Sequence, residues 1–143
     1  MSAPKTRKMD PVIHFEMPAE DTERARTFYE NAFGWQTISL GAEAGDFVLA
    51  LTTESDDKTR IPKSRGAING GLFQRTEPAQ GIQVTILVDD IEEAIQRIQT
   101  AGGELLTEPF EVQGVGLFAR FKDTEGNVSQ VNQDFAIKRL PQD

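Results

Sequence analysis

Two side chains capable of acid–base chemistry stand two positions apart in the alternating segment Val12–Met17. A strand sends successive side chains to opposite faces, so His14 and Glu16 share one face and the large apolar side chains between them share the other. An imidazole, together with a carboxylate whose pKa is raised by a dry environment, can move protons on a substrate. The same residues also suit simpler roles, His14 as a hydrogen-bonded strand residue lining a pocket and Glu16 as a solvated carboxylate at its rim.

The strand that carries these residues belongs to an internal repeat. Residues 14–34 and 83–103 share a layout of strand, acidic turn, amphipathic helix and glycine stop, 69 positions apart. The identities fall at helix-start, helix-face and helix-stop positions: Asp21 and Asp90, Glu23 and Glu92, Ala25 and Ala94, Ala32 and Ala101, Gly34 and Gly103. The offset aligns Gln83 with His14, and Thr85 follows Gln83 on the same strand face.

Helix signals are clear in both copies of the repeat. The first helix is predicted over Thr22–Phe33, with Asp21 as N-cap and Gly34 as stop, and the second over Ile91–Ala101, after Asp90. Further strands are predicted at residues 47–52, 67–73, 105–106, 115–121 and 128–131.

Apolar spacing indicates which side chains join helix and sheet. Ala25, Phe28 and Tyr29 recur at helical spacing and predict the stripe of the first helix that packs on its sheet. In the second copy, Val84 and Ile86 are predicted to face the helix. Each half therefore has the order β-α-β-β-β.

This order sets the expected domain organisation. We expect a single domain over residues 10–135, made of module one (10–75), a linker (76–81) and module two (82–133), with a loose arm at residues 1–9. Inside module one, residues 53–66 form a polar connection too long for a tight hairpin, and we expect it to be mobile.

Two further positions have more than one interpretation. Arg120 interrupts an otherwise apolar predicted strand: facing inward it would hold an anion through two parallel hydrogen bonds, and facing outward it would be a solvated edge-strand charge. Asn69, Gly70 and Gly71 could let the backbone approach a ligand or could permit a bulge.

Composition limits the classes of partner. The net charge of −8 argues against nucleic acid, because phosphate binding needs clustered Lys and Arg. No apolar run reaches the roughly 18 residues of a membrane span, so no membrane partner is expected. The chain has no cysteine, which excludes disulfides and thiolate chemistry. A cytoplasmic location follows as the default expectation.

The ordered motifs resemble the vicinal oxygen chelate superfamily of glyoxalases, bleomycin-resistance proteins and extradiol dioxygenases. The resemblance extends over about residues 12–133 and rests on the order and spacing of its pieces. They are Val12-Ile13-His14-Phe15, Asp21, Arg24-Ala25, Phe28-Tyr29, Phe33-Gly34-Trp35, Val88-Asp89-Asp90-Ile91, Ala101-Gly102-Gly103, Gly116-Leu117-Phe118-Ala119 and Asp123-Thr124-Glu125-Gly126-Asn127.

The resemblance implies an α+β fold of two βαβββ modules, with curled sheets enclosing a cleft and the helices outside. Enzymes of the family hold one divalent metal with a residue on the first and last strand of each module. His14, Gln83 and Gln130 match three of these positions, and residues 67–73 offer neither a carboxylate nor an imidazole at the fourth. One imidazole and two neutral amides are poor donors for a dication, so no cofactor is expected, with a divalent metal as the alternative.

Three functions remain open on this sequence. The first is a metal-free small-molecule binding protein similar to the drug-sequestering resistance members. The second is an enzyme, either a metal-dependent lyase or dioxygenase (lactoylglutathione-lyase-like) with an atypical ligand shell, or a metal-free catalyst using His14 and Glu16. The third is a dimeric interaction protein with a vestigial cleft. The expected ligand contacts are His14, Glu16, Gln83, Thr85, Arg120 and Gln130. Open sheet edges and the resemblance both favour a homodimer.

Overall fold

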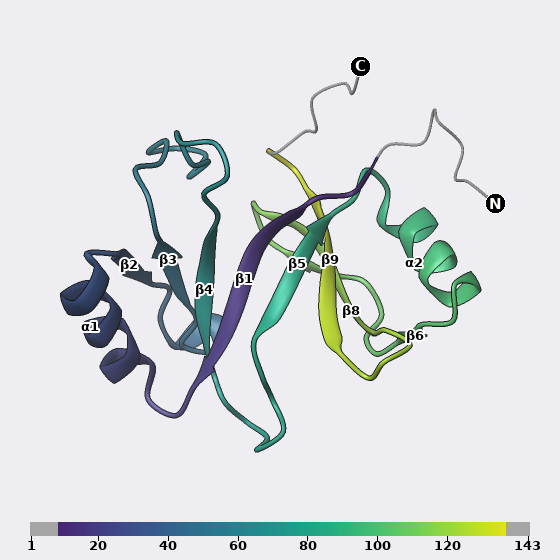
Figure 1. The fold of residues 1–143 in the computed structure, drawn as a ribbon, viewed down its shortest axis with the longest axis horizontal. Coiled ribbons are helices and arrows are strands. Elements are labelled where there is room, and N and C mark those ends of the chain that lie inside the picture. The colour runs from purple at the N-terminus through teal and green to yellow at the C-terminus, as the bar shows by residue number, and fades with distance from the viewer. Residues whose placement is uncertain (1–8, 137–143) are drawn as a thin grey trace. The chain divides into compact units, whose positions relative to one another are not determined.

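The computed structural model describes residues 9–136. These residues form nine strands, two α-helices and one short 3-10 helix (Figure 1). They divide into two compact units, residues 13–85 and residues 86 onward, the second of which also includes the segment before residue 13. The backbone N–H of Leu87 donates to the carbonyl of Pro11 at 2.9 Å, which ties that segment to the second unit.

Module one has the predicted βαβββ order. Its elements are β1 (Val12–Ala19), α1 (Thr22–Phe33), β2 (Gln36–Ser39), the 3-10 helix η1 (Ala42–Ala44), β3 (Val48–Leu51) and β4 (Asn69–Gln74). Hydrogen bonding gives the strand order β2-β3-β4-β1, with β1 and β4 parallel and the other pairs antiparallel. Helix α1 packs on β2, β3 and β4 and covers one face of this sheet (Figure 1).

The predicted ends of α1 are confirmed. The Asp21 carboxylate accepts a hydrogen bond from the Arg24 N–H at 3.0 Å, which satisfies one of the free donors of the first turn. Gly34 ends the helix with φ 73°, in the left-handed region that glycine adopts at low cost.

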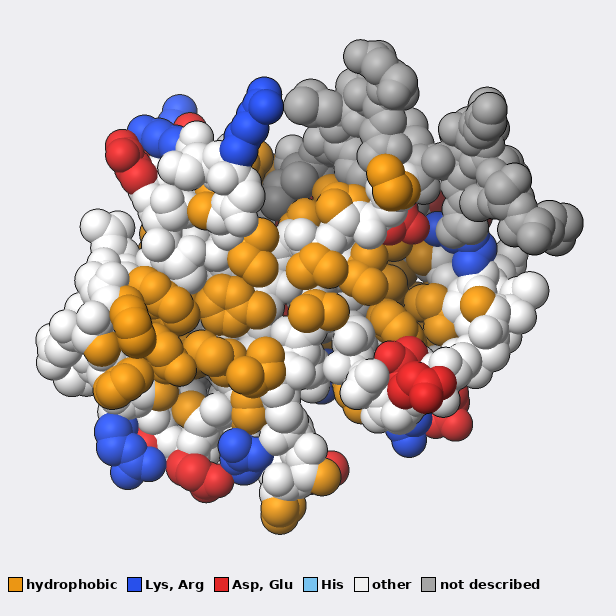
Figure 2. All heavy atoms as spheres, in the orientation of Figure 1, with side chains coloured by type: hydrophobic (Ala, Val, Ile, Leu, Met, Phe, Trp, Pro, Cys, Tyr) orange, Lys and Arg blue, Asp and Glu red, His pale blue; other side chains and the backbone are white. Residues whose placement is uncertain are grey.

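The apolar stripe of α1 differs from the prediction. Phe28, which belongs to the predicted stripe, is 57% exposed. Phe33, the last residue of the helix, is 65% exposed. The Phe28 ring meets the Tyr29 ring edge-on, and its centroid lies 6.3 Å from that of Phe33. Tyr29 in turn stacks on Trp35 at 4.5 Å. Apolar side chains gather on the surface of module one over this helix (Figure 2). The prediction that Phe28 packs on the sheet as a core residue is therefore wrong.

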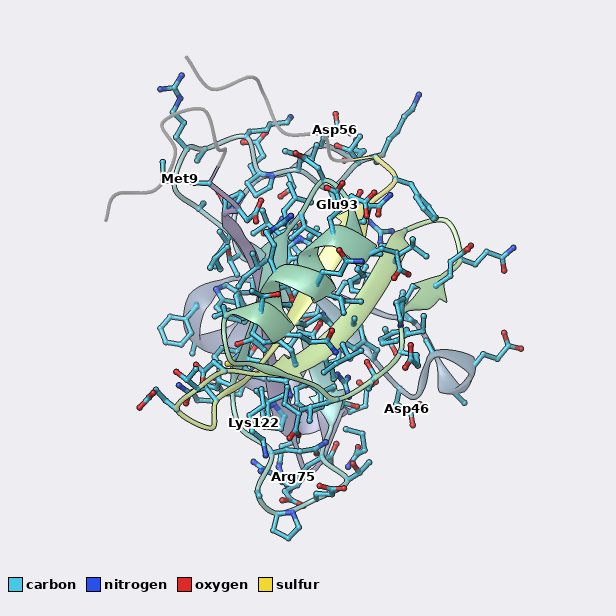
Figure 3. All side chains as sticks on the ribbon, turned by 90° about the vertical axis from the view of Figure 1, so that its right-hand side faces the viewer. Met9, Asp46, Asp56, Arg75, Glu93 and Lys122 are labelled. Atoms are coloured by element: carbon cyan, nitrogen blue, oxygen red, sulfur yellow. The ribbon has the colours of Figure 1, made fainter. Side chains whose placement is uncertain are left out.

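Module two repeats the order with one additional strand. Its elements are β5 (Gln83–Leu87), α2 (Ile91–Thr100), β6 (Glu104–Leu105), β7 (Phe110–Val112), β8 (Gly116–Lys122) and β9 (Val128–Asp134). Strand β8 pairs antiparallel with β9, β6 and β7. Asp90 caps α2 by accepting from the Glu93 N–H at 3.0 Å (Glu93 is labelled in Figure 3).

The core of module two lies between α2 and its sheet. It contains buried apolar side chains from α2, β8, β9 and the end of β5: Val88, Ile91, Ala94, Ile95, Ala119 and Val131. Ile86 packs against this cluster as predicted. Val84 is 37% exposed, so the side chains of β5 that pack toward the helix begin at Ile86 and not at Val84.

Several strand boundaries extend past the predictions. Strand β1 continues through Pro18, because a proline loses only one donor of the ladder and β1 pairs with β4 along that stretch. Strand β9 continues to Asp134. Strands β2 and β7, of four and three residues, are too short for their alternation to stand out in the sequence.

The α+β fold class and the two βαβββ modules are thus confirmed, and the domain boundaries remain a prediction. Within the described residues, neither helix has the length and apolar character needed to cross a bilayer.

Candidate functional site

His14 and Glu16 lie on the face of module one that is turned away from α1. The Tyr29 hydroxyl of α1 donates to Met17 Sδ at 3.8 Å, which orients the odd-numbered side chains of β1 toward the helix. The even-numbered side chains therefore point to the opposite face. Both His14 and Glu16 are half-buried there.

The neighbouring strand brings an amide and a glycine to the same face. In the register of β1 and β4, His14 stands opposite Asn69 and Glu16 opposite Gly71. A side chain at Gly71 would overlap the ring of Phe47, so this glycine makes room for an aromatic ring over the sheet. The tandem glycines thus serve close packing, and β4 shows no bulge.

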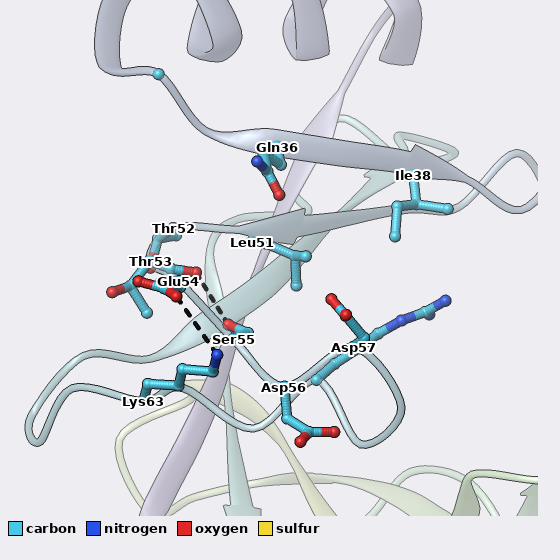
Figure 4. A pocket seen from close by; sticks show the side chains of 12 residues that line it. Gln36, Ile38, Leu51, Thr52, Thr53, Glu54, Ser55, Asp56, Asp57 and Lys63 are labelled. Carbon is cyan, nitrogen blue, oxygen red and sulfur yellow. Dashed lines mark hydrogen bonds and ion pairs between the residues drawn. The ribbon is translucent and has the colours of Figure 1, made fainter.

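A cavity of about 610 Å³ opens on this face at β2 and β3. The registers Gln36–Leu51, Leu49–Gly71 and Glu16–Gly71 show that its sheet residues share the face of His14 and Glu16. Its lining consists of sheet residues and one side of a loop: Gly34, Gln36, Ile38, Leu51, Thr52, Thr53, Glu54, Ser55, Asp56, Asp57, Arg60 and Lys63 (Figure 4). The volume falls within the range of small-molecule sites, and the lining is more polar than usual.

The loop that borders the cavity folds as a wide hairpin, which agrees with the prediction that this connection is too long for a tight one. Residues 54–63 fold back through an antiparallel bridge between Ser55 and Pro62. The Lys63 N–H donates to the Glu54 carbonyl at 2.9 Å, and the Lys63 ammonium lies 3.4 Å from the Glu54 carboxylate (Figure 4).

The tip of this hairpin is held by a carboxylate. Asp56 accepts from the backbone N–H groups of Lys58 and Thr59 at 2.9 and 2.8 Å, and the bond from Thr59 is the main reason that the pKa of Asp56 lies below its usual value. Arg60 follows with φ 61°, in the left-handed region. A non-glycine residue in that conformation requires support from its surroundings.

Asn69 gives that support and fixes the hairpin to the sheet. It is 3% exposed, and its Oδ1 accepts from the Thr52 N–H at 2.8 Å. Its Nδ2 donates to the Ser55 hydroxyl at 2.9 Å and to the Arg60 carbonyl at 3.0 Å. One buried amide thus organises the edge of the cavity. The sequence marks Asn69 as unusual only in being an amide at the start of an apolar strand.

Gln83 and Thr85, the counterparts of His14 and Glu16 in the repeat, are both buried, with exposed fractions of 7% and 1%. By strand alternation they point away from Ile86, which packs toward α2. Gln83 Oε1 is buried without a hydrogen-bond partner. Buried carbonyl oxygens rarely lack a partner, so this one is notable.

Arg120 and Gln130 are direct neighbours in module two. They are register partners in β8 and β9, while the adjacent pair Ala119 and Val131 is buried in the core against α2. Arg120 therefore faces away from the helix, and β8 has partners on both sides. The solvated edge-strand interpretation of Arg120 is wrong.

The structure thus brings together His14 with Glu16 and Arg120 with Gln130, each pair within one unit. Convergence of His14, Glu16, Gln83 and Gln130 in one cleft would join the two units, and it stays a prediction. Among residues 9–136, no group of three or more His, Asp or Glu side chains has the arrangement of a metal site.

Comparison with known proteins identifies the class. The family model of the Glyoxalase/Bleomycin resistance protein/Dioxygenase superfamily matches residues 12–131. A glyoxylase-like domain-containing protein from Didymella fabae is 31% identical over 121 residues, covering 81% of this chain and 88% of that protein. The chain therefore belongs to this superfamily.

One further relative and one solved structure are also similar to this chain. Anthracycline biosynthesis protein DnrV from Streptomyces peucetius is 28% identical over 120 residues, which cover 78% of this chain and 42% of that protein, so the chain spans about two-fifths of DnrV. Among solved structures, methylmalonyl-CoA epimerase from Streptomyces coelicolor, in complex with 2-nitronate-propionyl-CoA, shares the fold with a TM-score of 0.67 at 15% identity, covering 93% of this chain and all of that one.

Proposed function

We propose that this chain is a glyoxalase/bleomycin-resistance-like small-molecule binding protein that works without a tightly held metal. The observation that carries the proposal is the cavity of about 610 Å³ on the sheet face that also bears His14 and Glu16. The cavity wall of amides, hydroxyls and charges suits a small polar ligand. His14 and Glu16 lie on the same sheet face, on β1, and are not part of that wall. The proposed ligand contacts are His14, Glu16, Gln83, Thr85, Arg120 and Gln130.

The donor chemistry argues against a metal. The family positions carry one imidazole, His14, and two neutral amides, Gln83 and Gln130, which supply no negative charge. On β4 the neighbour of His14 is Asn69, whose amide already accepts one hydrogen bond from Thr52 and donates two to the hairpin. A dication would have too few anionic or strongly basic ligands, and if one bound, it would use His14, Gln83 and Gln130.

Catalysis would fall to His14 and Glu16. Both stand on one face of β1 and can give or take a proton from a ligand above that face. If the metal test below detects tight binding, the chain would instead be a lyase or dioxygenase with an atypical metal shell.

We further propose a homodimer in the cytoplasm. The edge strand β2 and the exposed aromatic rings of Phe28 and Phe33 provide surface that a second copy could cover. The lack of cysteine fits a reducing compartment. Light scattering at tens of micromolar protein checks the oligomer, and a monomer mass would count against it.

Equilibrium dialysis tests the metal-free function. The chain, purified without chelator or nickel resin, is dialysed against zinc, nickel and manganese, and the experiment is repeated with His14→Ala. We expect no stoichiometric binding by either protein. Micromolar or tighter binding that disappears in His14→Ala would overturn the proposal in favour of a metalloenzyme.

A further inference from the structure

A second set of polar groups lies on the face of module two that is turned away from α2. Arg120 of β8 stands opposite Gln130 of β9, and Asn132 follows Gln130 on the same face of β9. Gln130 is 3% exposed and Asn132 fully buried, and the Arg120 side chain is partly buried beside them. Strand geometry puts the three side chains within about 4.5–8 Å of one another at their bases.

Two atoms of this set are buried without a hydrogen-bond partner. One is Arg120 Nε, and the other is Asn132 Oδ1, although Asn132 Nδ2 donates to the Leu117 carbonyl at 3.1 Å. Buried polar groups are nearly always satisfied, so a cationic donor and a neutral acceptor on one sheet face, both without partners, need an explanation.

The arginine also lacks a counter-charge. None of the five ion pairs found within residues 9–136 involves Arg120. Arg75 shows the usual arrangement: its Nε also lacks an aligned hydrogen bond, but it lies 3.0 Å from the Glu20 carboxylate. A partly buried guanidinium with no carboxylate is costly unless a ligand provides the negative charge.

We propose that Arg120 and Asn132, with Gln130 between them, form an oxyanion subsite for a small carboxylate that carries a neighbouring hydroxyl group. The carboxylate takes the fork of Arg120 in parallel hydrogen bonds, a geometry that arginine provides and lysine does not. The hydroxyl donates to Asn132 Oδ1. The inference rests on the proposed small-molecule function and specifies its ligand class.

Binding is measured on the full chain by titration calorimetry with four probes: mandelate, phenylacetate, benzyl alcohol and inorganic phosphate. Mandelate carries both features, phenylacetate lacks the hydroxyl, and benzyl alcohol lacks the carboxylate. We expect mandelate to bind at least tenfold tighter than phenylacetate and much tighter than benzyl alcohol. Phosphate binding tighter than mandelate would overturn the carboxylate assignment in favour of a phosphorylated ligand.

Variants then assign the contacts. Arg120→Met should weaken mandelate binding at least thirtyfold, and Asn132→Leu should abolish the preference for mandelate over phenylacetate. The matched control is Lys122→Met, which removes the same charge two positions along β8 at an exposed residue (Lys122 is labelled in Figure 3). It should leave the affinity within twofold.

Stability separates a ligand role from a structural one. If the charge of Arg120 awaits a ligand, Arg120→Met should melt at or above the temperature of the parent chain, because it removes an uncompensated charge. A fall in melting temperature with unchanged mandelate affinity would overturn the inference. If benzyl alcohol binds well and Arg120→Met has no effect, the subsite fails while the small-molecule function stands. If none of the four probes binds, both fail.

Discussion

Replacing Asn69 with alanine should release the hairpin at residues 54–63 and destabilise module one. The amide is 3% exposed and makes three hydrogen bonds, one with the Thr52 N–H, one with the Ser55 hydroxyl and one with the Arg60 carbonyl. Alanine removes all three and leaves two backbone groups without protein partners. It also withdraws the contact that holds Arg60 at φ 61°.

The expected size follows from these bonds. At about 1 kcal/mol of net stabilisation each, three hydrogen bonds give about 3 kcal/mol. With an m-value of about 2 kcal/mol/M in urea, the unfolding midpoint should fall by roughly 1.5 M. Water can reach the freed hairpin, because its residues are mostly exposed, so the loss should not exceed this figure by much.

Urea unfolding followed by circular dichroism, together with hydrogen exchange across residues 54–63, measures both effects. Asn31→Ala is the control, since Asn31 is exposed on α1 and its replacement should change stability by no more than about 0.5 kcal/mol. A midpoint shift below roughly 0.3 M in Asn69→Ala, with unchanged exchange in the hairpin, would refute the structural role of this amide.

Three other substitutions test local features. Gly70→Ala should strongly impair folding, because its Cβ would overlap the backbone oxygen and ring of Phe15. Gly81→Ala is the control, since a Cβ there meets open space and should be tolerated. Equal expression levels and melting temperatures of the two variants would contradict this packing. Gly34→Ala should cost about 1 kcal/mol in thermal denaturation, since the C-cap sits at φ 73°, and a neutral result would mean that the helix end rearranges. Asp56 has a lowered pKa, so its stabilising effect is present at neutral pH and is lost as the pH falls through the lowered value. In Asp56→Asn, the free energy of unfolding should depend less on pH below the ordinary aspartate pKa of 3.8. Parallel pH profiles of parent and variant would count against the role of the Asp56 carboxylate in holding the hairpin tip.

The helices were predictable because their signals are local. The carboxylates of Asp21 and Asp90 each accept from the N–H three residues ahead, an interaction that needs no tertiary context. Phe28 follows the same helical period but is 57% exposed, with its ring against Tyr29 and Phe33. Periodicity alone does not predict that arrangement.

The edges of the candidate site depend on distant partners. The hairpin at residues 54–63 is fixed by Asn69, which lies 9 to 17 positions from its hydrogen-bond partners, so the hairpin was not visible in the loop's own sequence. The direction of Arg120 was recoverable: Leu117, Ala119 and Phe121 alternate and all pack toward the core, which leaves Arg120 on the other face. The apolar Phe118 lies on the same face as Arg120 and breaks this alternation in the sequence.

The measurement that tests the central claim most directly is a ¹⁵N–¹H correlation spectrum of the full chain titrated with a panel of small polar molecules, with and without zinc. The account predicts saturable shifts at amides of the face that bears His14, including Gln36, Leu51 and Asn69, that do not require zinc and that weaken in His14→Ala. Shifts that appear only with zinc, or that fall on the outer surfaces of α1 and α2, would contradict a metal-free ligand site on this face.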